Sequence, residues 1–267
     1  MKTFSRLVVF IVISLIIQSY LARMYHGLMD AAQGCDEYSI ELDSASTVAL
    51  HQRFWKDNYH SGRYCMDYSY RSESYIRSEA YRNELKLPRG ETYDQFWGAI
   101  YNSLYQNDSA ELKHLADSLR EIRLEKNLNS TEFAHMVVKF VQDIPYSYII
   151  SEPCGEMKDG KPCKGDSRFG ILSPIEFLYT LKGDCDTRTV LLYGLLKDFG
   201  YDALILISNE YLHSMLAVNI PGTGDYISHK GKKFYFWETT NTGWEPGMIA
   251  PDMQNTNYWD LALDYDI

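Results

Sequence analysis

Three side chains in this 267-residue sequence could together perform nucleophilic chemistry: Cys185, His213 and Glu238. A thiol can attack a carbonyl carbon when a base removes its proton and a third group orients that base. The three residues occur in the order thiol, imidazole, carboxylate. Cys185, His213 and Glu238 are therefore candidates for a nucleophile, a general base and the group that orients the base, and the alternatives are a hydrogen-bonded structural histidine and a glutamate on an edge strand.

The position of Cys185 favours this chemistry. Asp184 can cap a helix that begins at Cys185, apolar residues follow at helical spacing, and Gly200 ends it. The N–H groups and the dipole at a helix start stabilise a thiolate, so we expect a lowered pKa for Cys185. Asp184 and Asp186 would oppose a thiolate unless they are cap or turn residues, which is our interpretation. A buried cysteine with a purely structural role remains the alternative.

The elements around Cys185 must bring the other two side chains to it. Residues 203–207, 213–220 and 234–240 predict strands of an antiparallel sheet, with turn residues between them. Residues 129–144 predict an amphipathic helix, and a capping box at Ser173 opens a short one. We expect an α+β fold in which the helix of Cys185 packs on a sheet that carries His213 and Glu238.

Residues 24–128 predict an accessory helical region ahead of a catalytic domain at residues 129–267. Tyrosines crowd between Tyr59 and Tyr81 in a stretch poor in Leu, Ile and Val, which predicts a peripheral location for that stretch. Helix-permissive patterns cover residues 73–84, 93–105 and 110–128.

Four segments together resemble the transglutaminase-like superfamily, a branch of the papain-like cysteine enzymes, in its bacterial exported type. They are FVQDIPY from Phe140, SPIEFLYTLKGDCDTRTVLLYGLLKDFGYDALIL from Ser173, HSMLAVN from His213 and YFWETT from Tyr235. The resemblance covers residues 129–247, under half of the chain. It implies a papain-like core with a cysteine at a helix start and a histidine and an acid on successive strands.

The resemblance also implies roles for individual residues. Cys185 would form a thioester, His213 would act first as base and then as acid, and Glu238 would stand where many relatives have Asp. An N–H group must stabilise the oxyanion, and the backbone of Cys185 and the amide of Gln142 are our candidates. A structural Gln142, exposed or bound to the turn that follows it, is the alternative.

The chain has five cysteines, and an odd number in an oxidising compartment leaves at least one unpaired. Cys154 and Cys163 flank the turn-rich GEMKDGKP segment, which favours a disulfide between them. Nothing local supports pairing of Cys35 with Cys65, although it is possible. By elimination, Cys185 is the expected free thiol.

Residues 1–23 predict an export signal. Lys2 and Arg6 precede an apolar run at residues 7–17, which is shorter than the roughly 20 residues that span a bilayer but approaches the lower limit when extended to Ala22. The small residues of a cleavage site are poorly placed, which favours an uncleaved anchor over a cleaved signal peptide. We expect a protein of the cell envelope, on its periplasmic or extracellular side, held in the membrane by this segment.

Composition and motifs exclude other classes. The net charge of −10 disfavours nucleic acid as a partner. The sequence has no metal-binding HExxH motif and no glycine-rich phosphate loop, so we expect no metal and no cofactor. Two hypotheses remain. The first is an exported thiol enzyme that acts on amide bonds of a peptide or protein substrate, as a peptidase, amidase or transglutaminase. The second is a non-catalytic envelope protein-binding module, which the intact set of three residues disfavours.

Overall fold

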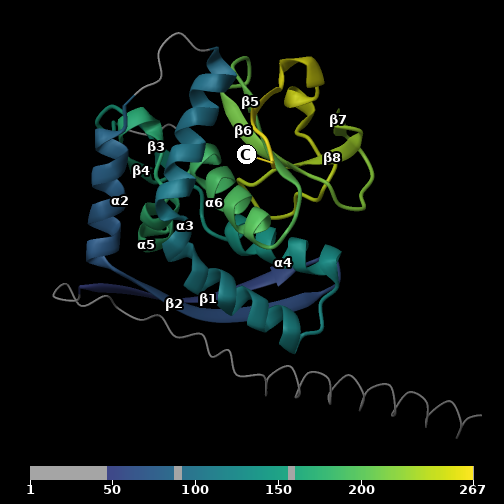
Figure 1. Cartoon of the computed structure of the whole chain (residues 1–267), viewed down its shortest axis with the longest axis horizontal. Helices are drawn as coiled ribbons and strands as arrows, with labels where there is room; N and C mark the ends of the chain where they lie inside the picture. The colour runs from purple at the N-terminus through teal and green to yellow at the C-terminus, as the bar shows by residue number, and fades with distance from the viewer. Residues whose placement is uncertain (1–46, 87–91, 156–159, 267) are drawn as a thin grey trace, which may run out of the picture. The chain divides into compact units, whose positions relative to one another are not determined.

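Residues 203–263 build one antiparallel sheet of five strands, in the order β7-β8-β6-β5-β9 (Figure 1). The structure is a computed structural model that describes residues 47–86, 92–155 and 160–266. The strands are β5 (Ala203–Ser208), β6 (His213–Val218), β7 (Tyr226–His229), β8 (Lys232–Trp237) and β9 (Asp260–Leu263).

Both faces of this sheet are covered, because β5 is apolar at every position except its last. Alternate side chains of a strand point to opposite faces. Ile205 and Ile207 therefore join the core on the helical side, and Leu204 and Leu206 join a second cluster with Trp259. The continuous aliphatic run read from the sequence is thus the central strand of a two-sided core.

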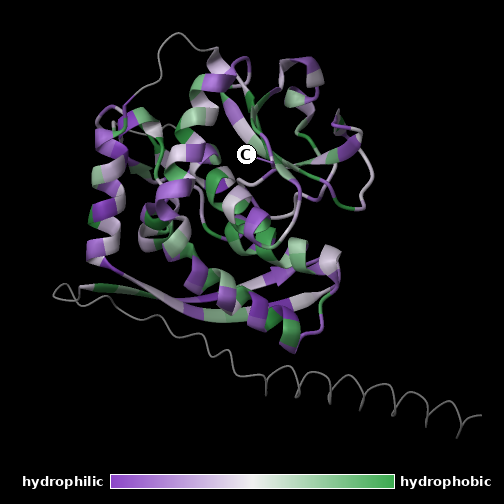
Figure 2. Ribbon diagram, in the orientation of Figure 1, coloured by the Kyte–Doolittle hydropathy of each residue, from purple (hydrophilic) through white to green (hydrophobic). Residues whose placement is uncertain are grey.

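α-Helices account for much of the remaining described chain, and one of them carries Cys185. α6 packs on β5 and β6 and also contacts α3 and α4. Figure 2 shows hydrophobic residues gathered in α6 and the strands beneath it. The helices are α2 (Ser72–Glu84), α3 (Tyr93–Glu125), α4 (Ser130–Gln142), α5 (Pro174–Thr180) and α6 (Cys185–Asp198).

The helix starts predicted from capping patterns are confirmed. Asn129 caps α4 and accepts from the Glu132 N–H, and Ser173 opens α5 with a capping box and proline in its first turn. The Asp184 carboxylate accepts from the Thr187 N–H at 3.1 Å, which fixes the first turn of α6. These local bonds explain why Cys185 stands at the first helical position.

The expectation that residues 24–128 are helical is confirmed for α2 and α3 but is wrong for residues 48–71. β1 (Val48–Asp57) and β2 (Gly62–Arg71) form an antiparallel hairpin, and alternate residues such as Tyr64 and Tyr68 are buried. Trp55 is buried with them and donates to the Met136 carbonyl of α4 at 3.0 Å. The tyrosine-rich stretch therefore contributes to the core, because a period of two turns its aromatic rings toward α4.

The accessory region and the predicted catalytic domain share one core. A single cluster runs from Trp55 through the helices to Leu263. α3 is one continuous helix across residues that we expected to form two, and it contacts β9 near the C-terminus. The described residues therefore belong to one compact unit, without a division at residue 129.

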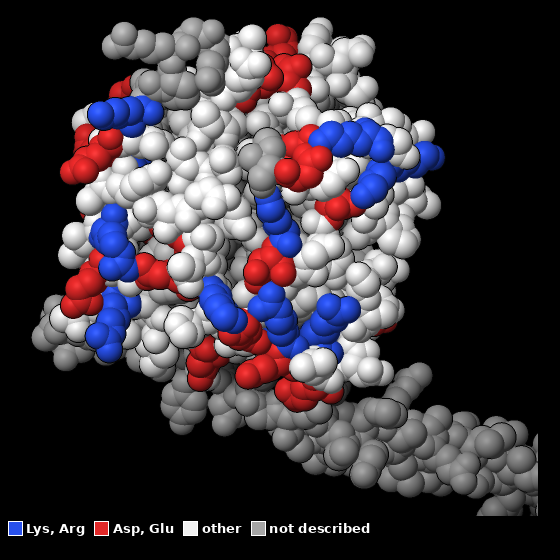
Figure 3. All heavy atoms as spheres, viewed as in Figure 1, with Lys and Arg blue, Asp and Glu red and all other residues white. Residues whose placement is uncertain are grey.

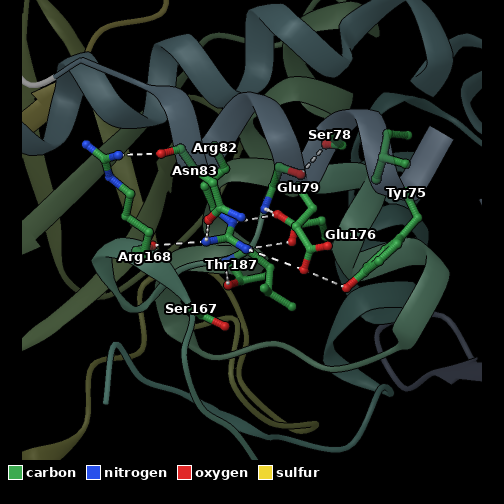
Figure 4. Close-up of polar contacts among 12 residues, drawn as sticks. Tyr75, Ser78, Glu79, Arg82, Asn83, Ser167, Arg168, Glu176 and Thr187 are labelled. Atoms are coloured by element: carbon green, nitrogen blue, oxygen red, sulfur yellow. Dashed lines mark hydrogen bonds and ion pairs between the residues drawn. The ribbon is translucent and has the colours of Figure 1, made fainter. Parts of the chain in front are cut away.

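A buried polar network joins α2 to α5 (Figure 4). The guanidinium of Arg82 donates to both carboxylate oxygens of Glu176, at 2.8 and 2.9 Å, and both side chains are almost fully buried. Asp108 of α3 accepts from Ser78 of α2 and from the N–H of Ile175. The buried charges of Arg82 and Glu176 thus neutralise each other, and hydrogen bonds satisfy the buried polar atoms. These contacts hold α5, the short helix before Cys185, in place.

Two short strands form a separate parallel pair. β3 (Tyr148–Ile149) pairs with β4 (Cys163–Lys164), and a disulfide joins Cys154 to Cys163 as predicted. The predicted signal segment, residues 1–23, and Cys35 lie outside the described residues. Among the described residues, no helix is long and apolar enough to span a membrane.

Candidate functional site

Cys185 is the first residue of α6 and carries a free thiol, as expected by elimination. It is 7% exposed. Cys65 is disulfide-bonded. The backbone N–H of Ser214, the residue after His213, faces the thiol. The fold therefore brings the start of α6 next to the start of β6, where the histidine lies.

His213 and Glu238 form a direct pair. The ring Nε2 of His213 lies 2.7 Å from Oε2 of Glu238. His213 begins β6, and Glu238 immediately follows β8, the neighbouring strand. The pairing of these two strands therefore positions the imidazole next to the carboxylate.

Glu238 is held as an acceptor. Its Oε1 accepts from the N–H of Thr239 at 2.8 Å, the N–H of Thr240 at 3.0 Å and the hydroxyl of Thr240 at 2.8 Å. Burial alone would raise the pKa of Glu238, but its bonds to His213 and Thr240 lower it below the ordinary value. An ionised carboxylate only accepts, so Nε2 of His213 donates and Nδ1 is left to accept a proton.

The environment of His213 makes it a stronger base. Burial would lower the pKa of His213, but the hydrogen bond and charge of Glu238, aided by Asp186 and Asp184, raise it. The ring of Trp259 packs edge-on against the imidazole, with 6.0 Å between the centroids. Glu238 and Trp259 together fix the ring orientation.

The expected lowering of the Cys185 pKa is wrong. Burial raises the pKa of the thiol well above its ordinary value, and the charges of Asp186 and Asp184 act in the same direction. The N–H of Ser214 opposes this shift without reversing it. Asp184 does cap the helix, and Asp186 accepts from the Tyr101 hydroxyl, but both carboxylates stay near the sulfur. Burial and the two nearby carboxylates therefore disfavour the thiolate form of Cys185.

Gln142 is buried at the end of α4 and does not offer a free amide N–H. Its Nε2 donates to the carbonyl of Glu238 at 2.7 Å and to the carbonyl of Trp244 at 3.2 Å. An amide NH₂ has two hydrogens, and these two bonds use them. Gln142 thus anchors the segment after β8 that carries Glu238, a structural role different from either alternative considered from the sequence.

A cavity of about 680 Å³ opens beside the pair. His213 and Gln142 line it, together with residues from three segments: 143–148 after α4, 160–162 next to the disulfide, and 240–242 after Glu238. Cys185 is not among the lining residues. The cavity therefore borders the histidine of the His213–Glu238 pair, and the buried thiol lies behind its wall.

Arg188, one turn after Cys185, belongs to the site but was missed in the sequence. Its buried guanidinium donates to four carbonyls, those of Gly183, Val141, Ile144 and Pro145, at 2.7 to 3.0 Å. These carbonyls come from two distant segments, so the sequence does not show that they meet at Arg188. The only available signal is general: the last carbonyls of a helix have no N–H partner within the helix and need a donor from elsewhere.

Charged side chains alternate in sign on the molecular face seen in Figure 3, where lysines and arginines lie next to aspartates and glutamates. Among the described residues, no group of three His, Cys, Asp or Glu side chains is arranged to hold a metal ion. Comparisons with protein-family models, curated proteins and solved structures found no match to this chain. Arguments about function therefore depend on the geometry of the site.

Proposed function

We propose that this protein is an exported thiol enzyme that transfers acyl groups at amide bonds of a peptide or protein, on a transglutaminase-like, papain-like fold. Cys185 is the nucleophile, His213 the general base and acid, and Glu238 the orienting carboxylate. The observation that carries the proposal is the 2.7 Å pair between His213 and Glu238 beside a helix that begins with a free thiol. The class of reaction includes hydrolysis and transfer to an amine.

The first half of the reaction breaks the amide. Nδ1 of His213 takes the thiol proton while the sulfur attacks the carbonyl carbon, and the π electrons of the carbonyl move to its oxygen. When the carbonyl re-forms, the carbon–nitrogen bond breaks and His213 gives its proton to the departing amine. A thioester at Cys185 remains. Water or a second amine then attacks it, again with His213 as the base, and releases the thiol.

The raised pKa of Cys185 supports proton transfer during attack rather than a thiolate formed beforehand. Burying a neutral thiol avoids the free-energy cost of removing a thiolate anion from water. His213 must be neutral to accept the proton, and its own pKa is raised. The rate of acylation should therefore rise with pH and reach its plateau above the ordinary histidine value of 6.5.

Two disulfides support a location outside the cytoplasm. Cys154 is bonded to Cys163, and Cys65 is disulfide-bonded as well. Structural disulfides persist mainly in oxidising compartments. We place the folded body on the periplasmic or extracellular side, with the hydrophobic N-terminal segment as membrane anchor or cleaved signal.

Acylation of the full-length chain by p-nitrophenyl acetate tests the proposal. Mass spectrometry after an acid quench should assign the acetyl group to Cys185, and Cys185→Ala should remove it. His213→Ala should slow acetylation by about 10²–10⁴, the usual contribution of a general base. His229→Ala is the matched control, because His229 lies at the end of strand β7 and also pairs with a carboxylate, that of Asp264 at 2.8 Å, but does not line the cavity.

Two results would refute the enzyme. The first is a Cys185 that is never acetylated in the folded protein. The second is equal acetylation in the wild type and in His213→Ala. Either result would favour the alternative, a non-catalytic envelope module that uses this fold to bind another protein. If Cys185 is acetylated, adding methylamine distinguishes hydrolysis from transfer, because only a transferase yields the N-methylamide in preference to the acid.

A further inference from the structure

Tyr146 lies close enough to Cys185 for the two side chains to interact electrostatically. It lines the same cavity as His213. The next residue, Ser147, donates its N–H to the carbonyl of Gly183 at 3.2 Å, two residues before Cys185. The chain around Tyr146 is thus fastened directly to the turn that presents the thiol.

Arg188 also contacts the Tyr146 segment. Its guanidinium lies 5.7 Å from the centroid of the Tyr146 ring and also donates to the carbonyl of Pro145 at 2.8 Å. Tyr148 packs edge-on against the ring, with 5.4 Å between centroids. A ring with these two neighbours has restricted rotation, which is what a preorganised hydrogen-bond donor needs.

The hydroxyl of Tyr146 has its hydrogen available. It makes no hydrogen bond to any residue in the described part of the chain. Burial and the nearby groups Cys185 and Asp184 raise the pKa of this phenol, so the hydroxyl keeps its proton throughout the working pH range. Gln142, by contrast, has given both amide hydrogens to carbonyl oxygens.

We propose that the Tyr146 hydroxyl, together with the backbone N–H of Cys185, donates hydrogen bonds to the oxyanion formed when the thiol attacks a carbonyl. The first N–H groups of a helix have no acceptor within the helix, so that of Cys185 is a natural second donor. The inference rests on the proposed function, since it assigns a catalytic role within the same reaction. It replaces Gln142 as the side-chain donor.

The two donors act at one moment of the reaction. As the carbon–sulfur bond forms, the π pair of the carbonyl becomes a lone pair on oxygen, and the phenol and N–H groups face that charge without transferring a proton. When the oxygen re-forms its double bond and the leaving group departs, the donors are released. A reaction of the thiol that forms no oxyanion therefore gains nothing from Tyr146.

Two probes of the full-length chain separate these cases. Iodoacetamide alkylates the sulfur with loss of iodide and forms no oxyanion, whereas p-nitrophenyl acetate acylates it through a tetrahedral oxyanion. Tyr146→Phe should leave the alkylation rate of Cys185 within twofold of wild type and slow acetylation at least tenfold, with about 10²–10³ as the effect of losing a strong donor. Tyr105→Phe is the control, because it removes a phenol hydroxyl on α3, away from the cavity.

Other outcomes overturn the inference in distinguishable ways. Equal rates with both probes in Tyr146→Phe and wild type would show that the hydroxyl does not meet the oxyanion. Equal slowing with both probes, or loss of the folded state in a thermal melt, would make Tyr146 a structural residue. A wild-type Cys185 that is alkylated but never acetylated would refute the proposed function itself, and this inference with it.

Discussion

Glu238→Gln should nearly abolish acylation, because the two carboxylate oxygens of Glu238 accept different numbers of hydrogen bonds. Oε1 of Glu238 accepts three hydrogen bonds from Thr239 and Thr240, and Oε2 accepts one from His213. A glutamine has one amide oxygen and one NH₂ group. If the oxygen keeps the three donors, the NH₂ faces Nε2 of His213.

The energies decide this orientation. Turning the amide around would lose three hydrogen bonds worth about 1 kcal/mol each and leave buried donors without acceptors, at about 1–3 kcal/mol each. The amide therefore donates to Nε2 of His213, which must then hold a lone pair, and the ring proton moves to Nδ1. That nitrogen can no longer accept the thiol proton. A wrong tautomer of this kind costs about 10⁴ in kcat in a serine protease triad, or about 5.5 kcal/mol in the barrier.

The assay is the rate of acetylation of Cys185 across pH 5 to 9, alongside thermal melts. Glu245→Gln is the matched control: Glu245 follows the same strand and pairs with Lys139 at 2.7 Å, but it does not touch His213. Acetylation by Glu238→Gln within tenfold of wild type, in a folded protein, would refute the tautomer argument. A similar loss in Glu245→Gln would show that the effect is structural.

Three further predictions concern stability and the cavity wall. Because the pKa of His213 is raised, its charged form stabilises the fold fully below the ordinary histidine value of 6.5, and this stability is lost as pH rises through the folded-state pKa. Because the pKa of Glu238 is lowered, its ionised form stabilises the fold fully above the ordinary glutamate value of 4.5, and this stability is lost as pH falls through the folded-state pKa. The melting temperature should therefore drop most in His213→Ala between these two values, and an equal drop at pH 9 would contradict the linkage. Replacing both Cys154 and Cys163 by Ser should raise KM for a peptide substrate more than it lowers kcat, because residues 160–162 wall the cavity; unchanged steady-state kinetics would disprove this role. Arg82→Met should destabilise the fold by about 3–5 kcal/mol in urea unfolding, because it leaves a buried carboxylate unpaired, yet should not alter alkylation of Cys185.

The local sequence predicted the elements of the site well because their signals are local. The Asn129 and Ser173 caps and the helix start at Asp184 depend on bonds that span three residues. The β-hairpin at residues 48–71 was missed although its aromatic residues alternate. Whether such a pattern is peripheral or buried depends on α4, which covers it from elsewhere in the chain.

Residue types, their order and the family resemblance singled out Cys185, His213 and Glu238 as candidates for a nucleophile, a base and an orienting acid. Tertiary structure alone decided how these groups behave. The pKa of Cys185 depends on burial, and the hydrogens of Gln142 are taken by carbonyls about a hundred residues away in the chain. Periodicity and capping act over a few residues and can be read along the chain. Electrostatics and hydrogen-bond partnership depend on which segments the core brings together.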